Sequence, residues 1–346
     1  MLGERVQKVL CAIVESYISM PLPVGSMVIT KRYSFSLSPA TIRHIMADLE
    51  GKGFLSQPHT SAGRVPTDKG YRAYVDYLRE KGIGVDRELY DILKRNLETL
   101  SDLNIALSKV TSALSSLSHC LAFAAPLGSA ITLNRIQLYR YRGSQVVAVV
   151  LSNEGIIKNK VIETDFGLSQ KDLSRISDYL NSEFSGLNIE EIRLTLAEQV
   201  SKEKAFCDIL MSKAMVLCRE ALSFSFDDVF MSGFSGLLTE LLGVPGLSSR
   251  VKDIVRTIED KKFILKLLEG LSCPQEVNVI IGSENSMNEM KGLSVVFAPY
   301  KQGDKSLGCL GIIGPTRMNY SKTIPMVESA VGTISIAISG GQFARG

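Results

Sequence analysis

The chain has 346 residues, enough for about two or three domains with a sizeable core. Hydrophobic residues make up 45% of it and charged residues 22%, a composition that is ordinary for a folded soluble protein. The net charge is only +3, so any affinity for nucleic acid has to come from a local patch rather than from the whole chain.

The six cysteines are scattered and form no CxxC pair, which argues against a disulfide framework and against a zinc site. The opening stretch MLGERVQKVL lacks the apolar region of a signal peptide. The apolar run LAFAAPLGSAITL is too short for a membrane span and is broken by Pro126 and Gly128. We therefore expect a cytoplasmic protein without a cofactor and without a membrane partner.

Two amphipathic segments open the chain. Apolar residues recur at helical spacing over residues 5–18, and the segment SMPLP ends that first helix with two prolines. A short second helix is predicted over residues 24–34, with Ser26 as a plausible N-cap and with Lys31 and Arg32 near its end.

The third helix, residues 38–51, begins with Ser38 as N-cap and Pro39 at the first helical position. At about 100° per residue, one face of this helix is apolar and the opposite face is small and polar. The apolar face carries Ile42, Ile45, Met46 and Leu49, and the outer face carries Ala40, His44, Ala47 and Gly51, flanked by Thr41, Arg43 and Asp48. Small residues allow close approach to a surface, and a DNA major groove admits such a helix.

A hairpin and a fourth helix follow. The segments GKGFLSQP and RVPT are predicted as short strands around the tip HTSAG. Thr67 can cap a helix over DKGYRAYVDYLRE. Between residues 28 and 79 there are eight Lys or Arg and four acidic residues, so this segment carries 8 − 4 = +4, more than the whole chain. The hairpin residues that would project toward phosphates or the minor groove are His59, Thr60, Ser61 and Arg64.

Three helices followed by a hairpin are typical of a winged helix-turn-helix that binds double-stranded DNA. Thr41, Arg43 and His44 would then read base edges, and Lys31, Arg32, Arg72 and the hairpin residues would contact phosphates. Arg43 taken alone could be a solvated helix charge, and His59 could be a loop histidine without a role. The residues expected at the DNA are Lys31, Arg32, Ser38, Ala40, Thr41, Arg43, His44, Ala47, His59, Thr60, Ser61, Arg64 and Arg72.

Beyond a linker at REKGIGVDR, apolar residues recur at helical steps over residues 86–118, as one helix or a broken pair. This segment could form a coiled-coil seam or pack on the protein's own sheet. A first strand set is expected in RIQLYRY, QVVAVVLS and GIIKNKVIET, followed by three helical stretches in 169–222. A second set is expected in DVFMSG, EVNVIIG, LSVVFAPY and LGCLGIIGPT, with one helix over 251–271 and a terminal helix over 323–339.

No group of residues in the sequence suggests catalysis, so we expect no enzymatic activity. His119 is the only histidine outside the first domain, which leaves little material for a His-based triad. The glycines of GCLGIIG do not have GxGxxG spacing and no GK[ST] follows, so tight packing in a strand explains them better than a phosphate loop. A biotin-ligase type of bifunctional repressor would need an adenylate loop such as GRGRxGR, which is missing from the sequence.

Several stretches resemble the heat-inducible transcription repressor family HrcA. The motifs LSPATIR, MADLE, QPHTSAGR and PTDKGYR in the first domain, and GPTRMNY followed by IPMVE near the other end, are similar to that family's signatures. Many relatives carry Asn and then an acid after TIR, where this sequence has His44 and Ile45.

The resemblance implies an α+β protein with an N-terminal winged helix-turn-helix and a GAF-like domain interrupted by an inserted sheet-plus-helices dimerisation domain. The implied ranges are 1–80 for the DNA-binding domain, 81–125 for the linker and long helix, 126–225 for the insert and 226–346 for the rest of the GAF-like domain. The first strand set could instead belong to the GAF-like sheet.

The resemblance further implies a homodimer that represses chaperone operons from an inverted repeat and is modulated by the chaperonin. The alternative is a regulator controlled by a small-molecule effector in a GAF-like pocket.

Overall fold

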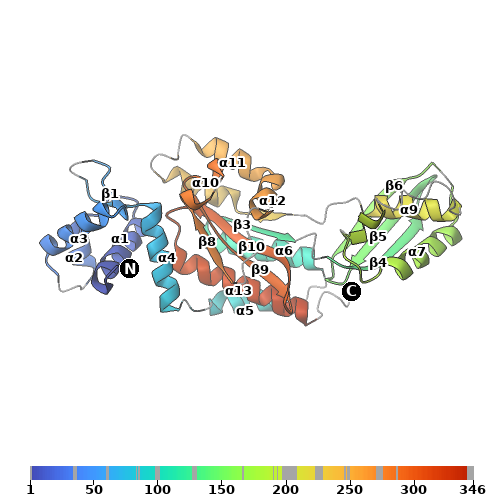
Figure 1. Cartoon of the computed structure of the whole chain (residues 1–346), viewed down its shortest axis with the longest axis horizontal. Coiled ribbons are helices and arrows are strands. Elements are labelled where there is room, and N and C mark those ends of the chain that lie inside the picture. Colours follow the sequence, from blue (N-terminus) through green and yellow to red (C-terminus); the bar gives the residue numbers. More distant parts are fainter. Residues whose placement is uncertain are drawn as a thin grey trace.

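The computed structural model shows an elongated molecule in which three units follow one another (Figure 1). It describes residues 2–33, 37–59, 62–82, 84, 86–97, 102–126, 131–165, 167–189, 191–192, 194–196, 209–222, 229–244, 247, 250–269, 276–285 and 287–340. Both helices and strands are present in the arrangement of an α+β protein, as the sequence predicts. Among these residues, no helix is long and apolar enough to cross a membrane.

The N-terminal unit consists of helices around a small hairpin, in the order expected of a winged helix-turn-helix. Its elements are α1 (Glu4–Ser19), α2 (Ser26–Arg32), α3 (Pro39–Gly51), β1 (Leu55–Ser56), β2 (Val65–Pro66) and α4 (Asp68–Lys81). The apolar faces predicted for the first and third helices are buried, among them Leu10, Ile13, Ile42 and Leu49. Tyr71 and Tyr74 of α4 are buried as well.

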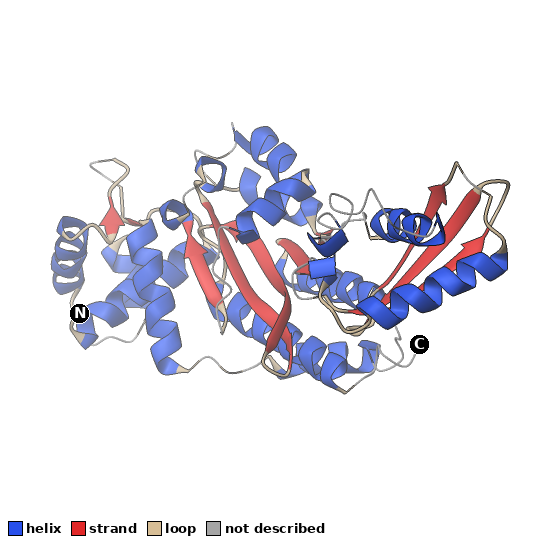
Figure 2. Cartoon of the chain, turned by 45° about the vertical axis from the view of Figure 1, so that its right-hand side comes forward, coloured by secondary structure: helices blue, strands red, loops and turns tan. Residues whose placement is uncertain are grey.

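The central unit is built on a five-stranded antiparallel sheet with the strand order β7-β3-β10-β9-β8. Its strands are β3 (Leu121–Pro126), β7 (Phe230–Ser232), β8 (Asn278–Ile281), β9 (Leu293–Gln302) and β10 (Lys305–Pro315). Helices cover both faces of this sheet (Figure 2). They are α5 (Arg87–Leu97), α6 (Leu103–Ser118) and α13 (Tyr320–Ser339) on one side, and α10 (Phe234–Leu242), α11 (Val251–Glu259) and α12 (Lys261–Glu269) on the other.

Burial on both faces explains why the strands of this sheet are continuous apolar runs. Alternate residues of β3 belong to two different hydrophobic clusters: Ala122 and Ala124 face α6 and α13, whereas Leu121 and Phe123 face α10 to α12. Of the two alternatives for the segment 86–118, the structure shows packing within the protein's own central unit: α6 lies on β3 and β7 of the sheet, and α5 lies on α13.

Some elements of this unit differ from the sequence-based expectation. The run LAFAAP, considered above only as a membrane-span candidate, forms the strand β3 next to β10. The single helix expected over 251–271 is two helices, because the chain turns at the extended residue Asp260 between α11 and α12. Helix α10 had no predicted counterpart.

The glycines of β10 have the packing role predicted for them. A β-carbon on Gly311 would lie 2.5 Å from the Val296 carbonyl oxygen, and one on Gly314 would lie 2.6 Å from the Cys120 sulfur. Real β-carbons do not come so close to neighbouring atoms, so these positions require glycine for tight strand and side-chain packing.

The third unit is a separate three-stranded antiparallel sheet with the order β4-β5-β6, located at the far end of the molecule (Figure 1). Two helices, α7 and α9, pack on each other and on this sheet. The bounds are β4 (Leu133–Arg140), β5 (Gln145–Ser152), β6 (Ile157–Glu163), α7 (Gln170–Phe184) and α9 (Ile209–Ala221). The first strand set therefore forms its own sheet, inserted between β3 and β7 of the central one.

Candidate nucleic-acid interface

Helix α3 begins as its sequence predicts. The Ser38 hydroxyl accepts a hydrogen bond from the Thr41 amide at 3.1 Å and lies 2.9 Å from the Thr41 hydroxyl. Pro39 occupies the first helical position. This cap fixes where the helix starts and therefore which residues face outward.

The outer face of α3 is open to solvent. Ala40, Arg43, His44 and Ala47 are exposed, and Thr41 is half-buried beside the cap. The face opposite to them packs on the core of the N-terminal unit. A helix with small residues flanking Arg and His can approach a DNA groove closely while two long side chains reach base edges. The structure brings together this part of the predicted site.

Lys31 and Arg32 lie in the last turn of α2, adjacent to α3, and both are exposed. The Arg32 guanidinium donates a hydrogen bond to the Ser19 hydroxyl at 2.8 Å, which orients it along the surface. Positive side chains at such a position can bind phosphates beside the groove that α3 would enter.

The hairpin is shorter than predicted but is present, with Leu55 paired to Pro66 and Ser56 to Val65. At its base the backbone amides and carbonyls of Val24 and Arg64 bond to each other at 2.8 and 2.9 Å. His59 lies exposed toward the tip. Thr60 and Ser61, also predicted at the DNA, lie outside the described residues.

Arg64 is placed differently from the expectation that it projects from the hairpin. Its guanidinium forms an ion pair with Glu50 at 2.7 Å, and its side chain is only 20% exposed. The hairpin strands are two residues long, so Arg64 belongs to the hairpin base rather than to its tip. Arg64 therefore connects the hairpin to the end of α3.

Arg72 does not join the exposed surface of α3 either. Its guanidinium forms an ion pair with the carboxylate of Glu284 and donates a hydrogen bond to the Val279 carbonyl at 2.6 Å. Glu284 lies 212 residues away along the chain, so no sequence signal in the first domain could have indicated this partner. Arg72, which was predicted to contact phosphate, is thus bound to the central unit in this structure.

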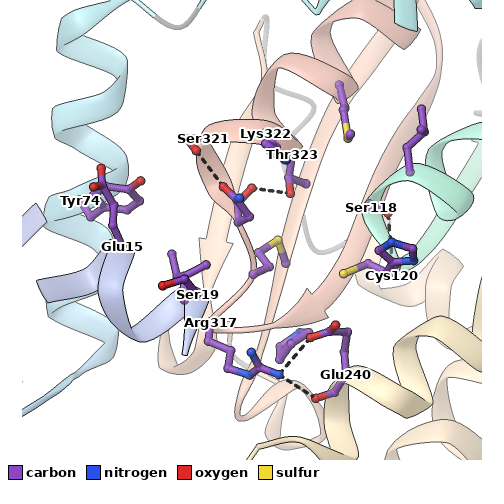
Figure 3. Close-up of a pocket in the computed structure, with 17 residues that line it drawn as sticks. Glu15, Ser19, Tyr74, Ser118, Cys120, Glu240, Arg317, Ser321, Lys322 and Thr323 are labelled. Carbon is purple, nitrogen blue, oxygen red and sulfur yellow. Dashed lines mark hydrogen bonds and ion pairs between the residues drawn. The ribbon is translucent and has the colours of Figure 1, made fainter. Parts of the chain in front are cut away.

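A pocket of about 500 Å³ lies where the N-terminal and central units meet (Figure 3). Its lining includes Glu15, Tyr74, Arg317 and Lys322, and Arg317 is ion-paired with Glu240 at 3.0 Å. The small-molecule alternative would require an apolar cavity within the central unit to hold its effector. This pocket lies between two units instead and is lined in part by charged side chains.

Comparisons with known proteins agree with the fold and with the motifs. The family model described as HrcA protein C terminal domain matches residues 104–324. The heat-inducible transcription repressor HrcA of Thermodesulfovibrio yellowstonii is 41% identical, and that of Geobacter sulfurreducens is 37% identical. Each match covers 98% of this chain and 99% of the relative.

The crystal structure of a hypothetical protein superposes with a TM-score of 0.68 at 23% identity, covering 98% of this chain and 99% of that one, and shows the same fold. The family model spans residues 104–324, and the relatives match almost the full length at 41% and 37% identity. The chain therefore belongs to the HrcA family of heat-inducible transcription repressors.

Proposed function

We propose that this chain represses transcription of chaperone operons by binding an inverted-repeat DNA site as a homodimer. Membership of the family supports the role of heat-inducible transcription repressor. The observation that carries the DNA-binding part is the exposed outer face of α3, on which Ala40, Arg43, His44 and Ala47 lie together. Lys31 and Arg32 flank this face and supply positive charge for the phosphates.

Dimerisation through the inserted unit is supported by exposed apolar side chains at the two ends of the open sheet face, on either side of a row that carries Gln137 and Asn159. The strand register places Tyr139 next to Val147, and Val147 next to Val161, in one row across the three strands. In a second row Leu151 pairs with Ile157 on one side and with Arg135 on the other. Tyr139 is 46% exposed, Val161 51% and Ile157 42%. A second copy could cover this face by a two-fold contact in which the same patch meets itself.

The chaperonin is a further proposed partner, which would keep the repressor competent to bind DNA. The proposal predicts that purified chaperonin increases the fraction of repressor that shifts an inverted-repeat DNA in a gel assay. The small-molecule alternative is not favoured, since family membership points to a heat-inducible repressor.

The test of sequence reading is a gel-shift titration of the inverted repeat and a scrambled DNA with an Arg43→Ala variant. A side chain that bonds a base edge contributes about 1–3 kcal/mol of discrimination, so the variant should lose about tenfold affinity for the repeat and much less for scrambled DNA. Arg175→Ala, which removes an equal charge from the exposed surface of α7, is the matched control and should bind both DNAs normally. Equal losses on both DNAs would contradict base reading by Arg43.

A further inference from the structure

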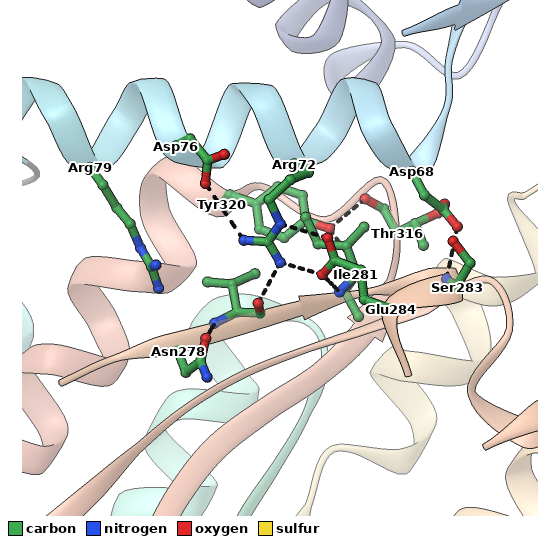
Figure 4. A network of polar contacts seen from close by, with 12 residues as sticks. Asp68, Arg72, Asp76, Arg79, Asn278, Ile281, Ser283, Glu284, Thr316 and Tyr320 are labelled. Atoms are coloured by element: carbon green, nitrogen blue, oxygen red, sulfur yellow. Dashed lines mark hydrogen bonds and ion pairs between the residues drawn. The ribbon is translucent and has the colours of Figure 1, made fainter. Parts of the chain in front are cut away.

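Helix α4 of the N-terminal unit is fastened to the central unit by polar side chains along one of its faces (Figure 4). At the centre, Arg72 binds Glu284 through two nitrogens and also reaches the Val279 carbonyl of β8. Glu284 in turn accepts a hydrogen bond from the Ile281 amide at 2.9 Å. A bidentate pair of this kind fixes direction as well as distance.

Two further contacts flank this pair. The Asp68 carboxylate accepts a hydrogen bond from the Ser283 amide at 2.8 Å, and Arg79 donates one to the Val277 carbonyl at 2.7 Å. We call these contacts and the Arg72 pair the α4 junction. Its members are Asp68, Arg72 and Arg79 on α4, and Val277, Val279, Ser283 and Glu284 on the central unit.

The backbone of the central unit is shaped for this contact at Gly282. Its φ is +47°, and a β-carbon there would lie 2.6 Å from the carboxylate carbon of Asp68. Only glycine combines that backbone conformation with such close approach. The backbone of the central unit is therefore sterically complementary to α4 at the α4 junction, in addition to the charge pairing.

An aromatic contact lies beside the polar ones. Tyr71 of α4 and Tyr320 at the start of α13 have ring centroids 6.1 Å apart, and both side chains are buried. The Tyr320 hydroxyl donates to the Thr316 carbonyl at 2.8 Å and lies 2.7 Å from the Ser294 hydroxyl. The motif GPTRMNY thus contributes its tyrosine to the same contact between units.

The junction leaves the proposed DNA-binding face uncovered. Helix α4 stands between the central unit and the rest of the N-terminal unit, whereas α3 lies on the far side (Figure 1). Helix α3 makes its principal contacts with α1, α2 and β1 only, among the described elements. Fastening α4 therefore sets the direction in which α3 points without blocking it.

We propose that Arg72 and Glu284 are positioning residues for operator binding, which hold the N-terminal unit in the orientation that lets both copies of a dimer meet their half-sites. This inference rests on the proposed function. A dimer binds the second half-site intramolecularly, and the effective concentration for that step depends on how well the second unit is already oriented. Loss of the α4 junction lowers this effective concentration and leaves the contacts of α3 with a single half-site unchanged.

The rival role for Arg72 is a direct phosphate contact, and the two roles predict opposite effects of one substitution. Glu284 is the nearer of two carboxylates at Arg72, since Asp76 lies 3.8 Å from another nitrogen of the guanidinium. Removing Glu284 would leave Arg72 less neutralised and would strengthen binding if Arg72 met phosphate. If Arg72 acts by positioning, removing Glu284 breaks the junction and weakens binding to the full repeat.

The experiment measures affinity of the full-length chain for the complete inverted repeat, for a single half-site and for scrambled DNA, in wild type, Arg72→Ala, Glu284→Ala and Glu284→Gln. We expect both alanine variants to lose about tenfold affinity for the full repeat and less than about twofold for the half-site. Glu284→Gln keeps the side-chain shape and should fall between them and wild type. Matched controls are Lys81→Ala and Glu289→Ala, which remove one exposed charge from α4 and from the central unit outside the junction.

Tighter binding of Glu284→Ala together with equal losses for Arg72→Ala on repeat and half-site would overturn the inference. Unchanged affinity of both alanine variants for the full repeat would also overturn it. A wild-type chain that does not distinguish the repeat from scrambled DNA would instead overturn the proposed function, and this inference with it. Thermal unfolding of each variant identifies a folding defect, in which case Glu284→Gln decides the outcome.

Discussion

The arginines of the N-terminal unit show how a partner decides the role of a residue. Arg43 on the outer face of α3 is exposed. Arg64 is held by Glu50 within the unit, and Arg72 by Glu284 of the central unit. The sequence shows equal charges on all three residues, and the roles differ because folding brings a carboxylate to only two of them. The proposed DNA surface accordingly contains fewer basic residues than the sequence alone would assign to it.

The Arg72–Glu284 pair gives a pH dependence whose sign can be worked out. Burial raises the pKa of Glu284, but the hydrogen bonds from Arg72 and the Ile281 amide outweigh it, so the pKa lies below the ordinary value of 4.5. A carboxyl with a lowered pKa contributes stability above its unfolded-state pKa, and this contribution is lost as the pH falls through the folded-state pKa. We therefore expect wild type to unfold at a higher temperature than Glu284→Gln near neutral pH.

That difference in unfolding temperature should shrink as the pH falls below 4.5, because Glu284 becomes protonated in wild type. Calorimetry of both chains across this range measures it. A difference that stays constant into strong acid would show that the charge of Glu284 contributes nothing to the folded state. Glu289→Gln, which removes an exposed carboxylate nearby and outside the α4 junction, is the control for the loss of one negative charge.

At the scale of elements, the start of α3 can be tested through its cap. Replacing Ser38 by Ala removes the acceptor for the Thr41 amide, which should lower the free energy of unfolding by about 1 kcal/mol. Urea unfolding of Ser38→Ala against wild type measures this loss. Ser174→Ala in α7 is the control, because that exposed hydroxyl bonds only the preceding turn at Gln170 and caps nothing. A loss no larger than that of the control would contradict the capping role.

Elements with clear apolar periodicity and with turn residues at their ends can be predicted from the sequence. Prediction fails where the apolar pattern is ambiguous. Strand β5 occupies the predicted stretch QVVAVVLS, since alternation and flanking turns define it. Strand β3 is a short, Ala-rich apolar run buried on both faces, which periodicity cannot distinguish from a buried helix segment. The break at Asp260 carries no Gly or Pro to mark it.

The candidate site likewise has one part that the sequence predicts and one part that it does not. The exposed face of α3 follows from helical spacing and a local cap, so it could be predicted from the sequence. The partner of Arg72 depends on a contact between units 212 residues apart, which no local pattern records. Arg64 lies at the base of the short hairpin, where its backbone bonds Val24, and no local pattern in the sequence records this contact.

At the scale of the whole molecule, the three units fit the division of work that the proposed dimeric repressor requires. The N-terminal unit carries the proposed DNA surface, the α4 junction fastens it to the central unit, and the inserted unit lies at the opposite end of the molecule (Figure 1). The Glu154 carboxylate lies 3.4 Å from the Lys305 ammonium and thereby joins the inserted unit to the β9–β10 hairpin. Because such contacts connect the three units, dimer contacts of the inserted unit at one end would set the distance between the two DNA-binding units at the other end.

The proposed dimer face makes the last prediction. Val161→Lys places a charge at the β6 end of the apolar row formed with Tyr139 and Val147, where a second copy would have to desolvate it. Since Val161 is 51% exposed in one chain, the folded monomer should tolerate the change, while the dissociation constant of the dimer should rise at least about tenfold. Analytical ultracentrifugation measures this, with Leu242→Lys on α10, 57% exposed, as the matched control. Affinity for the full repeat should fall together with dimerisation while the half-site affinity stays, and a Val161→Lys chain that remains dimeric would place the interface elsewhere.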